Sequence, residues 1–208
     1  MGYMVLKFYA VKKGYATGIF KTWDECKKQV FGYPGALYKS FRNREEAEAW
    51  LTGKKTHANP YLPDILKEDE MIAYVDGSYK DNCYAYGVIL ITANETIEHA
   101  RGFCHKENAK LRNVSGELEG ARYAMQIALR QNIKHLYIAH DYVGIAFWAD
   151  GSWKANLPFT QSYQKYCQEV QNNLQLSFVK IKSHSGNFYN DCADRLAKQA
   201  LEKILEKE

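Results

Sequence analysis

The chain has 208 residues, of which 46% are hydrophobic and 25% are charged, and its formal net charge is +4. This balance is typical of a soluble globular protein with a sizeable core, and it excludes a wholly disordered or fibrous chain. The longest apolar runs, such as residues 84–92, are too short to span a bilayer, and no signal-peptide pattern opens the chain. We therefore expect no membrane partner and a cytoplasmic location.

Positive charge is concentrated at the N-terminal end. Residues 1–44 hold nine lysines and arginines against two acids, a net +7, which leaves −3 for residues 45–208. A basic segment beside a nearly neutral body is typical of a protein that binds a polyanion. A solvated lysine surface would produce the same count.

Residues 1–53 predict a small ββαβα domain. Three β-rich runs and two helix-start signals divide this segment, at residues 5–11, 16–20 and 36–41, and at Thr22 and Asn43. Thr22 and Glu25 have the spacing of a capping box, in which each residue satisfies a main-chain N–H of the other. A domain this short can bury only a modest core.

Residues 54–70 show no periodicity and contain glycine and proline, so we expect a linker there. Residues 71–208 predict a second domain. Its strands are expected at residues 71–75, 85–91, 97–104, 135–139 and 176–181, and its helices at 114–130, 143–149, 160–170 and 190–206. Three successive strands followed by alternating helices and strands indicate an α/β fold, with a mixed five-stranded sheet flanked by helices.

The cysteines are widely spaced, odd in number and without a C-x-x-C pair, at Cys26, Cys83, Cys104, Cys167 and Cys192. This pattern argues against a disulfide framework and against a structural zinc site. It indicates a reducing compartment.

Four carboxylates lie where such a sheet would gather them. Asp76 and Asp141 are expected at the ends of two strands, and Glu117 and Asp194 near the starts of two long helices. Clustered carboxylates repel one another, and a hard divalent cation such as Mg²⁺ or Mn²⁺ relieves that repulsion. Two such ions can activate a water and stabilise the leaving oxygen in phosphodiester cleavage.

Each of these acids also has a structural explanation when it is taken alone. Asp76 and Gly77 could form a turn, Asp141 could be a helix N-cap, and Glu117 and Asp194 could interact with helix dipoles. The four acids together favour a site more strongly than any one of them does.

The sequence resembles type 1 ribonuclease H in the order and spacing of its motifs over residues 71–206. These motifs are VDGS around Asp76, GEL around Glu117, the strand-end Asp141, HSG from His184 and DRLA from Asp194. The N-terminal segment resembles the hybrid-binding domain that precedes many such enzymes, through FYAVKKG from Phe8, TGIF from Thr17, TW at Thr22 and YKSF from Tyr38. The resemblance implies a ribonuclease H-like fold behind a hybrid-binding domain.

The resemblance also implies endonucleolytic hydrolysis of the RNA strand in an RNA/DNA hybrid, leaving a 5′-phosphate and a 3′-hydroxyl. It implies two Mg²⁺ ions, with Mn²⁺ as a substitute, and a monomer whose partner is the hybrid duplex. The implied catalytic and metal-holding carboxylates are Asp76, Glu117, Asp141 and Asp194. His184 would be a mobile catalytic histidine that handles protons or helps product release.

Further residues match positions that contact nucleic acid in the family. In the body these are Gly77, Ser78 and Asn113, whose amide can both donate to and accept from a ribose 2′-hydroxyl. In the N-terminal segment they are Tyr9, Lys13, Trp23, Tyr38 and Lys39, with aromatic rings against deoxyribose and lysines against phosphates. The chain departs from many relatives at Val114 and Ser40, and it has only a short loop at residues 150–158 where some carry a basic helix.

Two other classes of function stay open at this point. A catalytically silent nucleic-acid-binding module is disfavoured because all four carboxylates are present. A strand transferase on the same fold is disfavoured by the segment at His184 and by the N-terminal segment.

Overall fold

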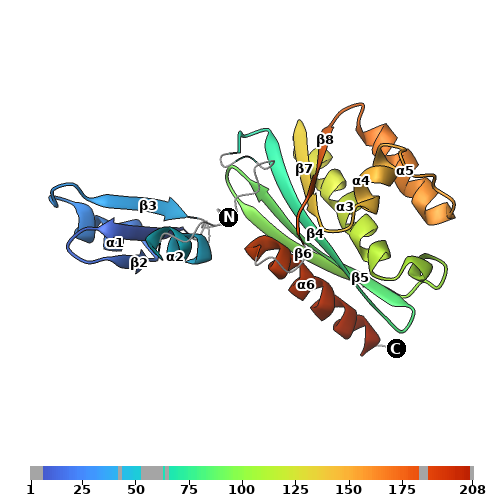
Figure 1. Ribbon diagram of the computed structural model, residues 1–208, viewed down its shortest axis with the longest axis horizontal. Coiled ribbons are helices and arrows are strands. Elements are labelled where there is room, and N and C mark those ends of the chain that lie inside the picture. Colours follow the sequence, from blue (N-terminus) through green and yellow to red (C-terminus); the bar gives the residue numbers. More distant parts are fainter. Residues whose placement is uncertain (1–6, 42–43, 53–62, 64–65, 183–186, 207–208) are drawn as a thin grey trace. The chain divides into compact units, whose positions relative to one another are not determined.

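A computed structural model describes residues 7–41, 44–52, 63, 66–182 and 187–206. The chain divides into two compact units, residues 1–58 and 59–208, which we call the N-terminal unit and the C-terminal unit and describe separately (Figure 1).

The N-terminal unit is a three-stranded antiparallel sheet with two helices. Its elements in chain order are β1 (Phe8–Lys13), β2 (Gly18–Phe20), α1 (Trp23–Val30), β3 (Leu37–Phe41) and α2 (Arg44–Thr52), and the strand order is β2-β1-β3. The predicted ββαβα order is thus confirmed. The Thr22 hydroxyl accepts from the Glu25 N–H at 3.3 Å and the Glu25 carboxylate accepts from the Thr22 N–H at 3.2 Å, which forms the predicted capping box. Asn43 lies outside the described residues.

The core of this unit is small. Val11 is buried with Cys26 and Val30 of α1. Ala10 is buried as well, and because successive strand residues point to opposite faces, it faces the side of the sheet on which Ala47 of α2 is buried. A helix therefore covers each face, and the side chains of Trp23 and Tyr38, described below, are not part of this buried cluster.

The C-terminal unit is built on a mixed five-stranded sheet, as predicted. Its strands are β4 (Glu70–Lys80), β5 (Cys83–Thr92), β6 (Thr96–Phe103), β7 (His135–His140) and β8 (Gln175–Lys180), in the order β6-β5-β4-β7-β8. The β6-β5-β4 pairs are antiparallel, and the β4-β7 and β7-β8 pairs are parallel.

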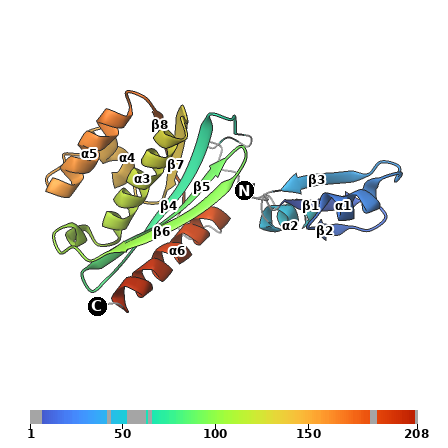
Figure 2. The same ribbon diagram turned by 180° about the vertical axis from the view of Figure 1, so that it is seen from behind.

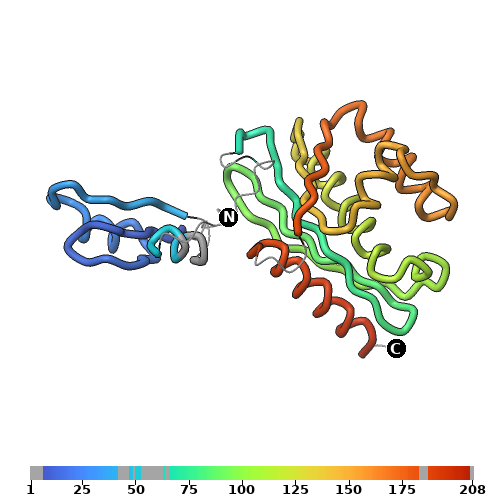
Figure 3. The backbone as a smooth tube through the Cα atoms, viewed as in Figure 1, coloured from blue at the N-terminus to red at the C-terminus, as the bar shows by residue number. Residues whose placement is uncertain are grey.

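Helices cover both faces of this sheet (Figures 1 and 2). They are α3 (Asn113–Arg130), α4 (Gly144–Ala149), α5 (Pro158–Val170) and α6 (Phe188–Leu205), with a short 3₁₀ turn at Asn108–Leu111. The side chains of α3, α4 and α5 pack on one face, and those of α6 pack on the other. The backbone trace shows α6 running alone across its face (Figure 3). No helix among the described residues is long and apolar enough to cross a membrane.

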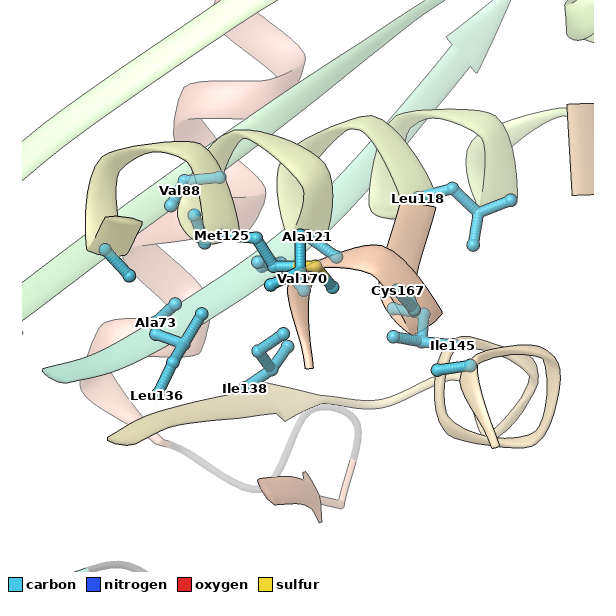
Figure 4. Close-up of a cluster of buried hydrophobic side chains, with 14 of the residues drawn as sticks. Ala73, Val88, Leu118, Ala121, Met125, Leu136, Ile138, Ile145, Cys167 and Val170 are labelled. Carbon is cyan, nitrogen blue, oxygen red and sulfur yellow. The ribbon is translucent and has the colours of Figure 1, made fainter. Parts of the chain in front are cut away.

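The main core lies between the sheet and α3 (Figure 4). It joins Ala73 and Val88 of the sheet to Leu118, Ala121 and Met125 of α3. A second core on the α6 face contains Ile72, Tyr74, Ile89 and Ala193. Full burial of one large apolar side chain stabilises the fold by about 1.5–3 kcal/mol. The central strand β4 lies between these two apolar cores, and an apolar environment disfavours the charged form of a carboxylate.

Two predicted positions need correction. Asp76 does not end its strand, because β4 continues to Lys80 by antiparallel pairing with β5. What ends just before Asp76 is the parallel ladder with β7, at Tyr74. Glu117 lies in the second turn of its helix, because α3 begins at Asn113.

Part of the predicted linker is packed against the C-terminal unit. Leu66 is buried in the second core, and the Asp69 carbonyl accepts from the Lys134 N–H at 2.8 Å. The proposed boundaries, with domains at residues 1–53 and 71–208 and a linker at 54–70, stay a prediction.

The expectation of no disulfide is wrong for one pair, because Cys83 and Cys104 are bonded to each other. Cys83 begins β5 and Cys104 directly follows β6, and their neighbours Tyr84 and Phe103 are paired across the two strands. Antiparallel pairing thus joins cysteines that are 21 positions apart, a proximity that cysteine spacing alone does not reveal.

Candidate active site

Asp76 occupies the centre of the sheet, just past the point where β4 and β7 stop pairing. It is partly buried, and its Oδ1 accepts from the Gly77 N–H at 2.7 Å. Beyond Tyr74, β5 is the strand that continues to form hydrogen bonds with β4, and pairing with β7 has ended. The β7 side of Asp76 is therefore open to groups from other elements.

Glu117 is brought to Asp76 by a close approach of α3. A Cβ atom on Gly77 would lie 2.0 Å from the Asn113 carbonyl oxygen, and one on Gly116 would lie 2.0 Å from the Ala85 carbonyl oxygen. Only glycine fits at either position, since the obstacles are main-chain atoms. The start of α3 therefore rests directly on β4 and β5, and the Glu117 side chain is only 1% exposed.

Asp194 reaches the same place through α6. A Cβ on Gly87 would lie 2.0 Å from the Ala193 carbonyl oxygen, so α6 also rests directly on the sheet. Asp194 lies in the second turn of α6, which begins at Phe188, and is thus near the start of that helix as predicted. Lys198, one turn later, holds its Nζ 2.7 Å from Asp194 Oδ2.

Asp141 directly follows β7, as predicted. Because Tyr74 pairs with Ala139 in parallel register, Asp141 and Asp76 each lie two residues beyond the end of that ladder. Lys180, the last residue of β8, donates a hydrogen bond from its Nζ to the Asp141 main-chain carbonyl.

Electrostatic interactions connect each of these four carboxylates to at least one other. The pKa of Asp76 is raised to about 7, first by burial and then by the charges of Asp141 and Asp194. The pKa of Glu117 is raised to about 9, again first by burial and then by Asp141 and Asp76. The catalytic and metal-binding roles of the four acids stay predictions.

The donor set suits a hard divalent cation. Glu117 Oε2 is buried and has no hydrogen-bond partner among the described residues. An unpartnered carboxylate oxygen beside other carboxylates lacks a counter-charge, and oxygen ligands of this kind suit Mg²⁺ or Mn²⁺. No group of three or more His, Cys, Asp or Glu side chains among the described residues is already arranged around a common metal position. His184 lies outside the described residues.

Three residues of the C-terminal unit that were predicted to contact nucleic acid lie next to these carboxylates. Gly77 and Ser78 follow Asp76 in β4. Asn113 is exposed at the start of α3 and donates from Nδ2 to Glu117 Oε1 at 3.4 Å. Arg112, before it, adopts a φ of 56°, a conformation that costs energy for a non-glycine residue and is common near functional sites.

The predicted residues of the N-terminal unit form an aromatic surface. The Trp23 ring centroid lies 5.7 Å from that of Tyr9 and 5.8 Å from that of Tyr38. Trp23 is 42% exposed and Tyr38 44% exposed, so of these three only Tyr9 packs against the small core. Lys13 and Lys39 are exposed. Rings from β1, α1 and β3 are thus available to a partner.

Sequence reasoning missed several residues that shape this site. Gly87 and Gly116 permit the helix approaches, while Lys180 and Lys198 place positive charges beside the acids. The i,i+4 spacing of Asp194 and Lys198 in a predicted helix could have indicated their ion pair. Nothing in the local pattern marks Gly87 or Lys180.

Comparison with known proteins finds two family models in tandem. Residues 7–51 match the model described as Ribonuclease H1 N-terminal domain, and residues 68–202 match the model described as RNase H.

Curated relatives agree with both matches. Ribonuclease H1 of Homo sapiens is 25% identical, covering 92% of this chain and 88% of that protein. Ribonuclease H of Saccharomyces cerevisiae is 54% identical over 52 residues, which are 25% of this chain and 15% of that protein.

Solved structures share the fold of the C-terminal unit. LC11-RNase H1, solved in complex with RNA/DNA hybrid, is 19% identical with a TM-score of 0.54, covering 65% of this chain and 99% of that chain. RNase H1 of Halobacterium salinarum is also 19% identical with a TM-score of 0.54, covering 64% of this chain and 98% of that chain.

Proposed function

Because the chain belongs to the type 1 ribonuclease H family, enzymes that cut the RNA strand of RNA/DNA hybrids, we propose that it uses two divalent ions for this hydrolysis. The products would carry a 5′-phosphate and a 3′-hydroxyl. The observation that carries the proposal is that Asp76 interacts electrostatically with Asp141 and Asp194, and that the buried Glu117 interacts with Asp141 and Asp76.

Asp76, Glu117, Asp141 and Asp194 would hold the ions, which we propose to be Mg²⁺, with Mn²⁺ as a substitute. Support comes from the unpartnered Glu117 Oε2 and from the raised pKa values of Asp76 and Glu117. When bound, the two ions would supply an activated water and offset charge on the departing 3′ oxygen.

Substrate recognition would begin next to the carboxylates. The Asn113 side chain already donates to Glu117, so a contact from its amide to a ribose 2′-hydroxyl would couple recognition of RNA to the catalytic carboxylate. Gly77 and Ser78 would contact the RNA strand beside the cut. His184 is proposed to handle a proton or to assist product release.

The N-terminal unit would tether the hybrid. Trp23, Tyr9 and Tyr38 would pack against deoxyribose, whose lack of a 2′-hydroxyl leaves room for a ring, while Lys13 and Lys39 would neutralise phosphates.

A monomer in the cytoplasm remains a proposal drawn from the sequence. The Cys83–Cys104 disulfide weakens the cysteine argument for a reducing compartment. Light scattering of the purified chain and fractionation of the source cells would test the two parts separately.

The decisive experiment compares wild type with Asp76→Asn on labelled substrates in Mg²⁺. Wild type should cut an RNA/DNA hybrid and spare single-stranded RNA and double-stranded DNA. Asp76→Asn should bind the hybrid but not cut it, while the matched control Asp191→Asn, an exposed acid in α6, should cut normally. Undiminished cutting by Asp76→Asn would overturn the metal site, and binding without cutting by wild type would favour a silent module.

A further inference from the structure

Lys180 is the last residue of the edge strand β8, and its side chain returns toward β7. Its main chain is in register with His140, and the next N–H, of Ile181, donates to the His140 carbonyl at 2.8 Å. From this position Lys180 Nζ donates to the main-chain carbonyl of Asp141. A residue 39 positions away in the sequence thus contacts the main chain of a candidate catalytic carboxylate.

The turn that carries Asp141 is held by side chains. Pairing between β7 and β8 ends at His140, so the next two carbonyl groups lie beyond the ladder. The Asp141 carbonyl accepts from Lys180, and the Tyr142 carbonyl accepts from His140 Nδ1 at 2.8 Å. Polar main-chain groups need such partners when water is partly excluded. The carbonyls of two successive peptide units, on either side of the Tyr142 Cα, therefore have side-chain partners.

The ammonium of Lys180 also acts on Glu117. Burial is the main cause that raises the pKa of Glu117, followed by Asp141 and Asp76, and Lys180 is the group that lowers it. Lys180 thus contacts the Asp141 main chain directly and also has an electrostatic effect on Glu117. Lys165, by comparison, forms an ordinary exposed ion pair with Glu169 at 3.9 Å, and it serves below as the control for Lys180.

We propose that Lys180 is a positioning residue of the active site, which fixes the main chain of Asp141 by donating a hydrogen bond to its carbonyl oxygen. The inference rests on the proposed function, because it takes Asp141 to serve in cleavage. Neither a bound hybrid nor a bound ion needs to touch Lys180 for it to act. Its effect should therefore fall on turnover rather than on substrate affinity.

The first test is kinetic and uses the full chain with Mg²⁺. Lys180→Met keeps the aliphatic side chain and removes both the donor and the charge, and it should lower kcat by about tenfold with KM for the hybrid unchanged, since small displacements of catalytic groups slow turnover. Lys180→Arg, which can donate to the same carbonyl and keeps the charge, should recover most of kcat. Lys165→Met should behave as wild type. A rise in KM with kcat unchanged would overturn the proposal, because it would make Lys180 a substrate contact.

The second test does not need activity. Amide hydrogen exchange of the metal-free protein should be faster across residues 139–145 in Lys180→Met, and normal in Lys180→Arg and Lys165→Met. Unchanged exchange and unchanged kcat in Lys180→Met would refute the inference while leaving the proposed function intact. If wild type does not cut the hybrid, the proposed function fails, and the exchange data still decide whether Lys180 holds the Asp141 turn.

Discussion

Asp76 of β4 lies directly opposite Gly87 of β5 in antiparallel register. Side chains at paired positions point to the same face of a sheet, so the missing side chain at Gly87 leaves space immediately beside the Asp76 carboxylate. The main chain of α6 fills that space, because the Gly87 Cβ position lies 2.0 Å from the Ala193 carbonyl oxygen and 2.7 Å from the Ala197 nitrogen. Asp194, between Ala193 and Ala197, is thereby placed within electrostatic range of Asp76.

Gly87→Ala should therefore displace α6 and damage both stability and catalysis. The new methyl group would overlap main-chain atoms that cannot rotate away, so we expect the unfolding free energy to fall by about 3 kcal/mol. In protein that still folds, kcat should fall by up to about 100-fold because Asp194 moves. Urea denaturation and hybrid cleavage measure the two effects.

The matched control for that change is Gly120→Ala. Its Cβ would meet side-chain atoms only, the nearest being Val88 Cγ2 at 3.1 Å, and alanine favours the helix by about 1 kcal/mol. Near-normal stability and activity are expected there. Equal losses of stability and activity in both variants would mean that the close approach of α6 to Gly87 is not the cause of the loss.

Metal-free protein should lose stability as the pH rises. Asp76 and Glu117, with pKa values raised to about 7 and about 9, retain protons in the folded state that the unfolded chain has released. The folded state binds more protons over the range from about pH 4 to pH 9, so its stability is highest at the acidic end and falls toward the alkaline end.

Glu117→Gln should abolish the larger part of this loss of stability at alkaline pH, because the pKa of Glu117 is raised further than that of Asp76. In EDTA at about pH 8 its Tm should exceed that of wild type by roughly 5 °C, and near pH 4 the two should agree. Thermal melts across the range, with Glu169→Gln on the exposed surface of α5 as control, test this. Parallel stability curves for wild type and Glu117→Gln would show that burial of Glu117 carries no such cost.

The disulfide should make stability depend on redox state. Cys83 and Cys104 close a loop with a sequence separation of 21, and the entropy of such a loop in the unfolded chain corresponds to about 3 kcal/mol. Dithiothreitol should therefore lower the urea midpoint of wild type, and Cys104→Ser should show the lower midpoint with or without reductant. An unchanged urea midpoint of fully reduced wild type would show that this disulfide does not stabilise the fold.

Phosphate contacts by the N-terminal unit should appear in the salt dependence of binding. Lys39→Gln should reduce the slope of log affinity against log salt concentration by about one unit, because one fewer counterion is released. Trp23→Ala should weaken hybrid binding without changing the slope, and Lys165→Gln in the C-terminal unit should change neither. Identical slopes for wild type and Lys39→Gln would exclude Lys39 from the phosphate contacts.

Local patterns in the sequence predicted much of the fold. The capping box at Thr22 and Glu25, the apolar face of α3 and the apolar run of β5 depend on residues a few positions apart, whose periodicity and hydrogen bonding are readable directly. The same kind of information placed Asp141 correctly at the end of β7, where a strand pattern stops.

Positions that depend on pairing partners were predicted less well. Asp76 was expected at a strand end because the predicted strand covers residues 71–75, yet β5 continues to pair with the residues beyond it as far as Lys80. The bond between Cys83 and Cys104 follows from the register of β5 with β6. Neither outcome is encoded in the neighbouring residues.

By itself the sequence predicted which residues would carry the chemistry and in what order, because Asp76, Glu117, Asp141 and Asp194 lie in recognisable local segments. Tertiary structure alone decided how these acids meet. Helices α3 and α6 approach the main chain of the sheet this closely because Gly77, Gly87 and Gly116 lack a side chain, and Lys180 reaches Asp141 because β8 lies beside β7. Contacts between distant segments depend on strand register and on the distance between layers, which three-dimensional packing sets.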